Sequence, residues 1–405
     1  MKRLTAWLKP ENNFLYAVLG FSLLLRLAYV LKTGPGGLSP DAHDWLETAW
    51  RVASGRGFGN SWRPPGFVFF LTAVFKVFGK SAMAAKLIQA LLGTATVALT
   101  YGTARRLFTR GTARVAAVLL SFYPYLVAYT ADLLSETFLT FILACAVYYV
   151  TRVGAEPRWK NIVPAGILIG LAGLTKSVVL PFFVFACAWL WWRSRSFKAG
   201  FMVGVFTILT ILPWSFRNYF HYDSSYVMPV SSPWFSLYGS SCDEAFWNEN
   251  RGELDSPQTF ANNSPAIPKD WGYLSSLSMP ERDKICKEKA VGWIRANPDK
   301  FLALIRLRLS HFWRLYPMMA YKWQKYAAMA TSGLYIPLAL AGLLLSLQAF
   351  GGAALLAGLF FFYTLVHIFF VVTLRYRVPI DPYVIILAAY ALERGYLWFK
   401  TWQTK

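Results

Sequence analysis

The side chains of this sequence that could do chemistry are single carboxylates and cations at the ends of apolar segments. A carboxylate next to a hydroxyl can act as a general base, and an arginine can bind a phosphate through two parallel hydrogen bonds. Long cationic side chains at a membrane boundary also extend to water without any function, so the pattern matters only where the residues converge. The candidates, which we assign to one face of the protein, are Asp41, Asp44, Arg63, Lys176, Arg217, Arg375, Arg377 and Asp381.

The composition predicts the elements that must position these side chains. The chain has 405 residues, of which 56% are hydrophobic, 18% aromatic and only 15% charged. Soluble domains average about 25% charged residues, and disordered chains are poor in aromatic side chains, so neither class fits. The 41 Lys and Arg against 20 Asp and Glu mark cytoplasmic loops in a multi-pass protein, and we expect no nucleic-acid partner. We predict an all-α polytopic membrane protein that contacts membrane lipids.

About ten apolar segments are predicted to cross the membrane as helices. They comprise residues 14–31, 87–105, 115–129, 137–151, 162–174, 177–192, 201–216, 327–347, 353–372 and 382–396. Residues 65–78 are also apolar, but a helix of about 14 residues is only about 21 Å long, whereas the hydrocarbon core is about 30 Å thick. We therefore predict that this segment is an interfacial or re-entrant helix in the first external loop.

Basic residues predict the orientation of these spans. Short loops near residues 105–114, 152–160 and 193–198 are rich in Lys and Arg and share a side with the basic N-terminus, which the positive-inside rule places in the cytoplasm. We predict an inner (plasma) membrane protein with both termini cytoplasmic and a site that faces the periplasm or exterior. The loop at residues 32–86 is basic although it is predicted to be external, and this departure from the rule suggests that it holds an anion.

Residues 217–325 form the one long non-apolar stretch, and we predict that they make a small external domain between an N-terminal transmembrane module (1–216) and C-terminal transmembrane helices (326–405). One helix is expected to begin at a capping box from Ser278 to Glu281. Another, at 299–315, mixes Arg with large apolar side chains, as membrane-surface helices do. Cys242 and Cys286 lie in this segment and could pair in an oxidising compartment.

Short motifs in order along the chain resemble those of GT-C glycosyltransferases, in particular the branch of protein O-mannosyltransferases and lipid A aminoarabinose transferases. In the first external loop the motifs are DAHDW at 41–45, ASGRGF at 53–58, WRPPGF at 62–67 and FGKS at 78–81. The later motifs are ARRLF at 104–108, LSE at 134–136, LTK at 174–176, PWSFRNY at 213–219 and RYRVP at 375–379. The resemblance implies enzymes that take a sugar from an isoprenoid phosphate on the external face and invert its anomeric carbon.

The resemblance also implies roles for individual residues. An acid early in the first loop is the base for the acceptor hydroxyl, which matches Asp41; because this chain has Asp41-Ala42 where many relatives have Asp-Glu, Asp44 is an alternative. The residues expected to bind the donor phosphate are Arg63, Lys176, Arg217, Arg375 and Arg377, and those that could contact the substrate are His43, Glu136 and Tyr376. No cofactor is expected. A divalent metal fits the chemistry but is not indicated, because His43 and His221 show no ligand-like spacing.

The predicted function is transfer of a sugar from a polyprenyl-phosphate donor to a hydroxyl of a lipid, glycan or protein acceptor. Two alternatives stay open, a lipid-glycan ligase or assembly subunit and a lipid flippase or transporter without glycosyl transfer. A transporter needs ionisable groups deep in its spans, and only Arg26 lies plainly inside one.

Overall fold

The computed structural model describes residues 13–36, 38–59, 63–222, 233–250, 269–315, 326, 328–346, 350–370 and 372–404. Within these residues the regular secondary structure is helical, so the predicted all-α class is confirmed. The basic N-terminal residues, Trp62 of the first loop and several stretches of the predicted external domain lie outside the described residues.

The helices fall into two groups, before and after residue 222. The first are α1 (Asn13–Thr33), α2 (Pro40–Ala53), α3 (Pro65–Phe78), α4 (Ala82–Leu107), α5 (Arg110–Ser121), α6 (Pro124–Ala128), η2 (Tyr129–Ala131), α7 (Ser135–Ala155), α8 (Trp159–Thr175), η3 (Ser177–Val179), α9 (Leu180–Ser194) and α10 (Phe197–His221). The second are α11 (Pro233–Ser240), α12 (Asp243–Asn250), α14 (Trp271–Ser276), α15 (Met279–Ala296), α16 (Pro298–Phe312), η5 (Met329–Gly333), α18 (Leu334–Leu345), α19 (Phe350–Ile368), α20 (Leu374–Arg377), η7 (Val378–Ile380) and α21 (Asp381–Gln403).

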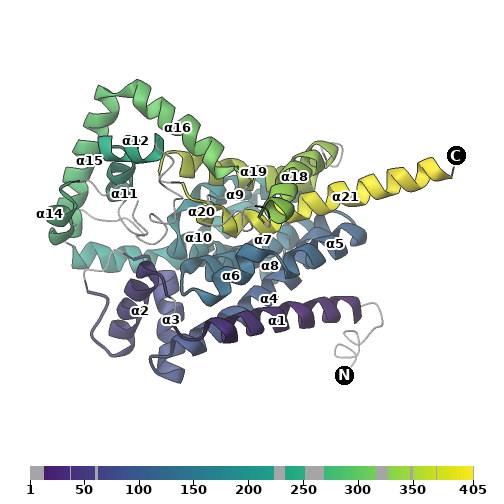
Figure 1. The fold of residues 1–405 in the computed structure, drawn as a ribbon, viewed down its shortest axis with the longest axis horizontal. Helices are drawn as coiled ribbons and strands as arrows, with labels where there is room; N and C mark the ends of the chain where they lie inside the picture. The colour runs from purple at the N-terminus through teal and green to yellow at the C-terminus, as the bar shows by residue number, and fades with distance from the viewer. Residues whose placement is uncertain are drawn as a thin grey trace.

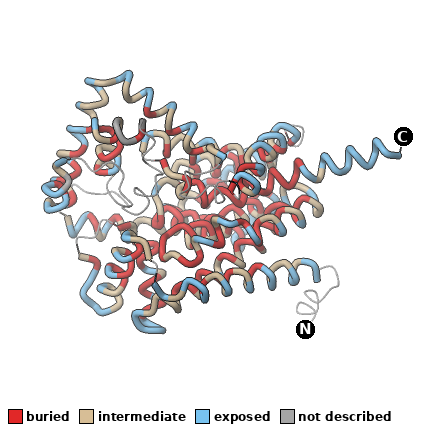
Figure 2. Tube along the Cα trace, viewed as in Figure 1, coloured by how far each residue is buried: buried red, intermediate tan, exposed pale blue. Residues whose placement is uncertain are grey.

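The long helices form a bundle with α7 in its core (Figures 1 and 2). Most residues of α7 are buried, and the helix packs against α4, α8 and α9. Along α8, Gly166 and Gly170 face α10 so closely that a side-chain carbon at either position would collide with it. Small residues let membrane helices approach in this way, and the Thr207 hydroxyl donates to the Gly166 carbonyl across the contact at 3.1 Å.

Five helical segments are long and apolar enough to cross a membrane, namely α1, α4, α7, Ser177–Ser194 and α10. Each contains or overlaps a predicted span, so these spans are confirmed as helices. The shorter apolar helices include α3, α8 and the segments that contain α18 and α19. Helix α3 has the bounds expected from the sequence, residues 65–78; its place at the membrane surface and the number of ten crossings stay predictions.

The predicted span at residues 115–129 is not one continuous helix. The chain bends by 51° between α5 and the α6–η2 segment, although the two pieces together are long and apolar enough to cross. Pro124 opens α6, and a proline cannot donate an N–H and clashes with the carbonyl four residues earlier. The Tyr123 N–H instead donates to the Leu120 carbonyl at 3.3 Å. The segment is therefore helical in two pieces, and its crossing of the membrane stays a prediction.

Helices α11 to α16 come from the predicted external domain. Helix α15 begins after Ser278, whose N–H donates to the Glu281 carboxylate at 3.2 Å, and the predicted capping box is confirmed. Helix α16 covers most of the second helix expected there. The two cysteines are free thiols buried in separate small clusters, Cys242 beside Ala245 and Cys286 in another, so they form no disulfide.

Helix α1 begins and α21 ends on the same side of the molecule, at the right of Figure 1, whereas α2, α3, α14 and α15 lie on the opposite side. The face of the membrane on which each terminus lies stays a prediction. The second half of α21 extends beyond the bundle and is exposed (Figure 2).

Candidate active site

Helix α2 presents Asp41 and Asp44 on one side. The Ser39 hydroxyl caps the helix by accepting from the N–H three residues later, at 3.4 Å, and Pro40 occupies the first turn, where no N–H is needed. The buried side of α2, which includes Trp45, packs against α3. Residues three apart are neighbours on a helix surface, so one cation can bind both acids.

Close packing of α3 on α8 brings Arg63 to this pair. At Gly66, in the first turn of α3, a side-chain carbon would lie 2.9 Å from the Thr175 nitrogen and 3.0 Å from the Leu174 carbonyl carbon, so only glycine fits without movement. The largely buried guanidinium of Arg63 lies 4.8 Å from the centroid of the Trp45 ring. The sequence WRPPGF therefore places a cation next to the acids of α2.

Six charged side chains of alternating sign form a continuous chain of ion pairs. This charged cluster consists, in order, of Asp44, Arg63, Asp41, Arg375, Glu136 and Lys176. Arg63 donates from Nε to Asp44 at 2.5 Å and from Nη2 to Asp41 Oδ1 at 2.8 Å. Arg375, from α20, donates from Nη1 to Asp41 Oδ2 at 2.8 Å. Both oxygens of Asp41 are thus held by arginines.

Glu136 is the most buried member of the charged cluster. It lies in the first turn of α7, and its Oε1 accepts from Arg375 Nε at 2.7 Å and from Lys176 Nζ at 2.8 Å. A buried carboxylate is tolerated only with such partners. Its second oxygen, Oε2, is buried without a hydrogen-bond partner among the described residues.

The Asp41 carboxyl is ionised at neutral pH. Burial works against its ionisation, but the guanidinium groups of Arg63 and Arg375 outweigh burial and hold the pKa of Asp41 below its usual value. Asp132 shows the opposite balance, because burial raises the pKa of its carboxyl even though the Ser39 hydroxyl donates to it at 3.3 Å. Sequence reasoning did not select Asp132, which joins the cap of α2 to the segment before α7.

Aromatic side chains border the charged cluster. The Lys176 ammonium lies 4.7 Å from the centroid of the Tyr376 ring, and Tyr376 stacks on His367 with centroids 5.6 Å apart. The His367 Nδ1 is bonded to the Tyr363 carbonyl at 2.7 Å. His367 is thus a buried packing residue beside the charged cluster, as a single histidine in an apolar segment is expected to be.

Three of the residues expected at the site have other surroundings. His43 is exposed on α2. Arg217, at the end of α10, lies 4.9 Å from the ring centroid of Trp214 and beside the first loop. Arg377 is fully buried and pairs with Asp381 at 3.0 Å. Since its guanidinium is enclosed there, Arg377 is not placed to bind a phosphate in the charged cluster.

The charged cluster pairs each of its acids with a cation. Within the described residues no three His, Cys, Asp or Glu side chains are grouped as a metal site. Each acid of the charged cluster is bound to at least one cation, so a metal ion would have to displace these cations. A phosphate would likewise have to take over the hydrogen bonds that the acids now accept from the arginines and the lysine.

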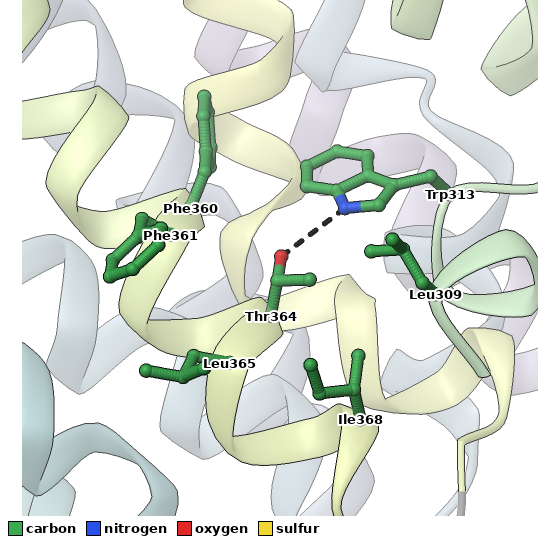
Figure 3. A pocket seen from close by; sticks show the side chains of 7 residues that line it. All are labelled: Leu309, Trp313, Phe360, Phe361, Thr364, Leu365 and Ile368. Carbon is green, nitrogen blue, oxygen red and sulfur yellow. Dashed lines mark hydrogen bonds between the residues drawn. The ribbon is translucent and has the colours of Figure 1, made fainter. Parts of the chain in front are cut away.

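An apolar groove of about 320 Å³ lies between α16 and α19 (Figure 3). It is lined by Leu309, Trp313, Phe360, Phe361, Thr364, Leu365 and Ile368. The Trp313 indole donates to the Thr364 hydroxyl at 3.2 Å, so the polar groups of the lining are bonded to each other. No member of the charged cluster lines this groove, and we treat it as separate from the candidate site.

A protein-family model matches a part of the chain that contains part of the candidate site. Residues 62–216, which include Arg63, Glu136 and Lys176, match the family model described as dolichyl-phosphate-mannose-protein mannosyltransferase. No curated protein sequence shows a significant match to this chain.

Solved structures show the same fold at low sequence identity. The apo oligosaccharyltransferase of Archaeoglobus fulgidus has a TM-score of 0.60 and 15% identity over 98% of this chain and 52% of that one. Its complex with an inhibitory peptide and a dolichol-phosphate has a TM-score of 0.58 and 15% identity, over 97% of this chain and 52% of that one. This chain therefore spans about half the length of that enzyme. ArnT from Cupriavidus metallidurans, bound to undecaprenyl phosphate, has a TM-score of 0.47 and 14% identity, over 95% of this chain and 78% of that one.

The charged cluster thus lies in a helical framework that solved glycosyltransferases share, and the family model matches the stretch that carries half of its members. The resemblance expected from the motifs is confirmed, and this chain has the fold of the GT-C glycosyltransferases.

Proposed function

We propose that this protein transfers a sugar from a polyprenyl-phosphate donor to a hydroxyl of a lipid, glycan or protein acceptor. The acceptor oxygen forms a bond to the anomeric carbon on the side opposite to the phosphate. The bond from that carbon to the phosphate oxygen breaks, and its electron pair leaves with the polyprenyl phosphate. The proton of the acceptor hydroxyl passes to Asp41, and the product has the inverted anomeric configuration.

The observation that carries this proposal is the convergence of the charged cluster. Asp41 and Arg375 are 334 positions apart in the sequence, yet they form an ion pair at 2.8 Å. Snorkelling would draw each side chain separately toward water, whereas Arg63, Glu136 and Arg375 are largely buried and bound to oppositely charged partners. Convergence of this kind is expected of a binding site for an anionic substrate.

The cations of the charged cluster provide the donor site. Arg63, Arg375 and Lys176 can bind the phosphate and stabilise the charge that grows on it as the sugar leaves. Both arginines hold Asp41 before the donor binds, so a phosphate that takes over their hydrogen bonds also frees this carboxylate. The pKa of Asp41 then rises from its lowered value, and Asp41 becomes a stronger base when the donor is in place.

Three further features support the polyprenyl donor and the face of the membrane. The similar oligosaccharyltransferase was solved with a dolichol-phosphate, which supports a polyprenyl phosphate as the ligand here. The apolar helices allow the isoprenoid chain to stay in the bilayer, and removing it into water would be costly. The charged cluster lies where α1 ends and α7 begins, the side that the basic loops predict to be external. The predicted external domain, 217–325, is our candidate for acceptor selection.

The test is transfer from a labelled polyprenyl-phosphate sugar by purified protein, with membranes as the acceptor source. Asp41→Asn keeps the size of the side chain but removes the base, so we expect kcat to fall by about 10²- to 10⁴-fold. Asp44→Asn is the matched variant on the same helix. The Asp44 side chain is 45% exposed, against 26% for Asp41, and we expect a smaller loss.

The outcomes separate the alternatives. Full activity in Asp41→Asn with loss in Asp44→Asn would make Asp44 the base, and full activity in both variants would end the carboxylate mechanism. Released polyprenyl monophosphate identifies a transferase of the proposed kind, whereas released diphosphate identifies a lipid-glycan ligase. Lipid movement across vesicles without any glycosylated product would support a flippase.

A further inference from the structure

A second buried ionic network lies next to the charged cluster in the sequence and shares none of its residues. Arg377 Nε donates to Asp381 Oδ1 at 3.0 Å, and the Tyr123 hydroxyl donates to Asp381 Oδ2 at 2.7 Å. These three residues are at most 2% exposed. Arg377 Nη1 also donates to the main-chain carbonyls of Phe312 at 3.2 Å and Arg314 at 2.9 Å. The network therefore joins α6, α16, α20 and α21 at one guanidinium.

This network holds the short helix that carries Arg375. Helix α20 has only four residues, and so short a helix has no stability of its own. Residues two apart on a helix point about 200° apart, which explains why Arg375 reaches Asp41 and Glu136 while Arg377 reaches Asp381. The single turn of α20 is thus held on one side by the charged cluster and on the other by Asp381, and the position of Arg375 depends on both sets of contacts.

The same guanidinium also sets the end of α16. The last carbonyls of a helix lack partners within the helix, and a cation at that end is favourable. Arg377 supplies both the hydrogen bonds and the charge at Phe312, the last residue of α16. Because α16 belongs to the predicted external domain, this domain and Arg375 are held by one side chain.

We propose that Arg377 is a positioning residue for the transfer reaction, and that with Asp381 and Tyr123 it holds Arg375 at the distance from Asp41 and Glu136 that donor binding requires. The inference rests on the proposed function. Arg377 is fully buried and makes no ion pair with the charged cluster. It acts only through Arg375, so its effect on the donor must vanish once Arg375 is changed.

A double-variant cycle tests this dependence. Lysine in place of arginine keeps the charge but loses the fork that bridges several acceptors. We compare Arg377→Lys, Arg375→Lys and the double variant by transfer kinetics and by direct binding of undecaprenyl phosphate, measured with native mass spectrometry. A displacement of about 1 Å costs about 10²-fold in rate. We expect Arg377→Lys to raise the donor KM and lower kcat, with a loss of about 10²-fold in kcat/KM and an unchanged acceptor KM.

The kcat/KM and the lipid affinity of the double variant should be no lower than those of Arg375→Lys alone. Independent residues give losses that multiply, so multiplied losses would show a general structural role and overturn the proposal. Tyr123→Phe removes only one hydroxyl from the network, and we expect about a tenfold loss, equal to about 1.4 kcal/mol. Wild-type kinetics and lipid affinity in Tyr123→Phe would overturn the proposal whether or not Arg377→Lys folds.

Glu393→Gln is the matched control. Glu393 is also an acid of α21, but it bonds to the hydroxyls of Thr109 and Thr112, about 18 Å along the helix from Asp381, and its variant should keep wild-type kinetics. A wild-type protein that binds undecaprenyl phosphate but transfers no sugar would refute the proposed function. The affinities of the four proteins in the cycle would still decide the inference.

Discussion

Gly66→Ala is expected to disable the site without changing any charged residue. A side-chain carbon at this position would overlap the Thr175 hydroxyl and lie 2.9 Å from the Thr175 nitrogen and 3.0 Å from the Leu174 carbonyl carbon. The hydroxyl can rotate away, but the two main-chain atoms belong to the end of α8 and cannot. Because optimal contacts between such atoms begin near 3.5 Å, α3 must move away from α8 by about half an ångström.

The movement acts on Arg63, which precedes Gly66 by three residues. Its hydrogen bond to Asp41, now 2.8 Å, would lengthen to about 3.3 Å, outside the usual range. Overpacking of this kind costs about 1–3 kcal/mol of stability. A displacement of about 1 Å costs about 10²-fold in rate, so half of that displacement predicts about a tenfold loss in kcat/KM.

The assay combines transfer kinetics with thermal unfolding in detergent, and Gly20→Ala is the control. Gly20 lies in α1 with no atom within 4 Å of an added carbon, so alanine there should leave activity unchanged. The double variant with Thr175→Ala removes the hydroxyl overlap but not the main-chain contacts, and it should recover only part of the loss. Wild-type rate and stability in Gly66→Ala would refute the steric reasoning. Full recovery in the double variant would show that the clash involves only the Thr175 side chain and not the main chain of α8.

Three other changes test the electrostatics. Arg63→Gln removes one of the two cations that lower the pKa of Asp41; that pKa then rises, so the acid limb of kcat/KM, which reports the free enzyme, should move to higher pH, as a pH–rate profile will show. Glu136→Gln removes the buried carboxylate that pairs with Lys176 and Arg375. The free energy of unfolding, measured by chemical denaturation, should fall by about 3 kcal/mol or more. Arg308→Met leaves the Glu249 carboxylate buried and unpaired. The contact between α12 and α16 should therefore be less stable, which faster amide hydrogen exchange in these two helices would show.

Much of the fold could be predicted from the sequence, because apolar length and basic loops are local signals. The start of α15 at its capping box and the bounds of α3 follow from the residues themselves. The break after α5 also has a local cause, Pro124, but an apolar run through a proline does not reveal whether the helix bends or continues. Only the packing around Tyr123 and Asp381 decides that.

The site was predicted in part, and the failures have a physical reason. Asp41, Arg63, Lys176 and Arg375 were assigned to one face, and the structure joins them through Glu136, which was expected only as a substrate contact. A face, however, does not specify which way a side chain points. Arg377 and Arg375 share a motif, yet they project to opposite sides of one helical turn. Such a difference depends on partners that are distant in the sequence, and no local pattern contains them.

The charged cluster holds three acids and three cations, and this neutrality suits the proposed reaction. A sugar linked to a polyprenyl phosphate is a phosphodiester with one negative charge, whereas the released polyprenyl monophosphate approaches two charges near pH 7. Cations without competitors would therefore bind the product more tightly than the donor and slow its release. Asp41 competes with the phosphate for Arg63 and Arg375, and Glu136 competes with it for Arg375 and Lys176. Re-formation of these ion pairs therefore offsets the stronger binding of the product. On this argument the acids serve both the proton transfer and the turnover of the site.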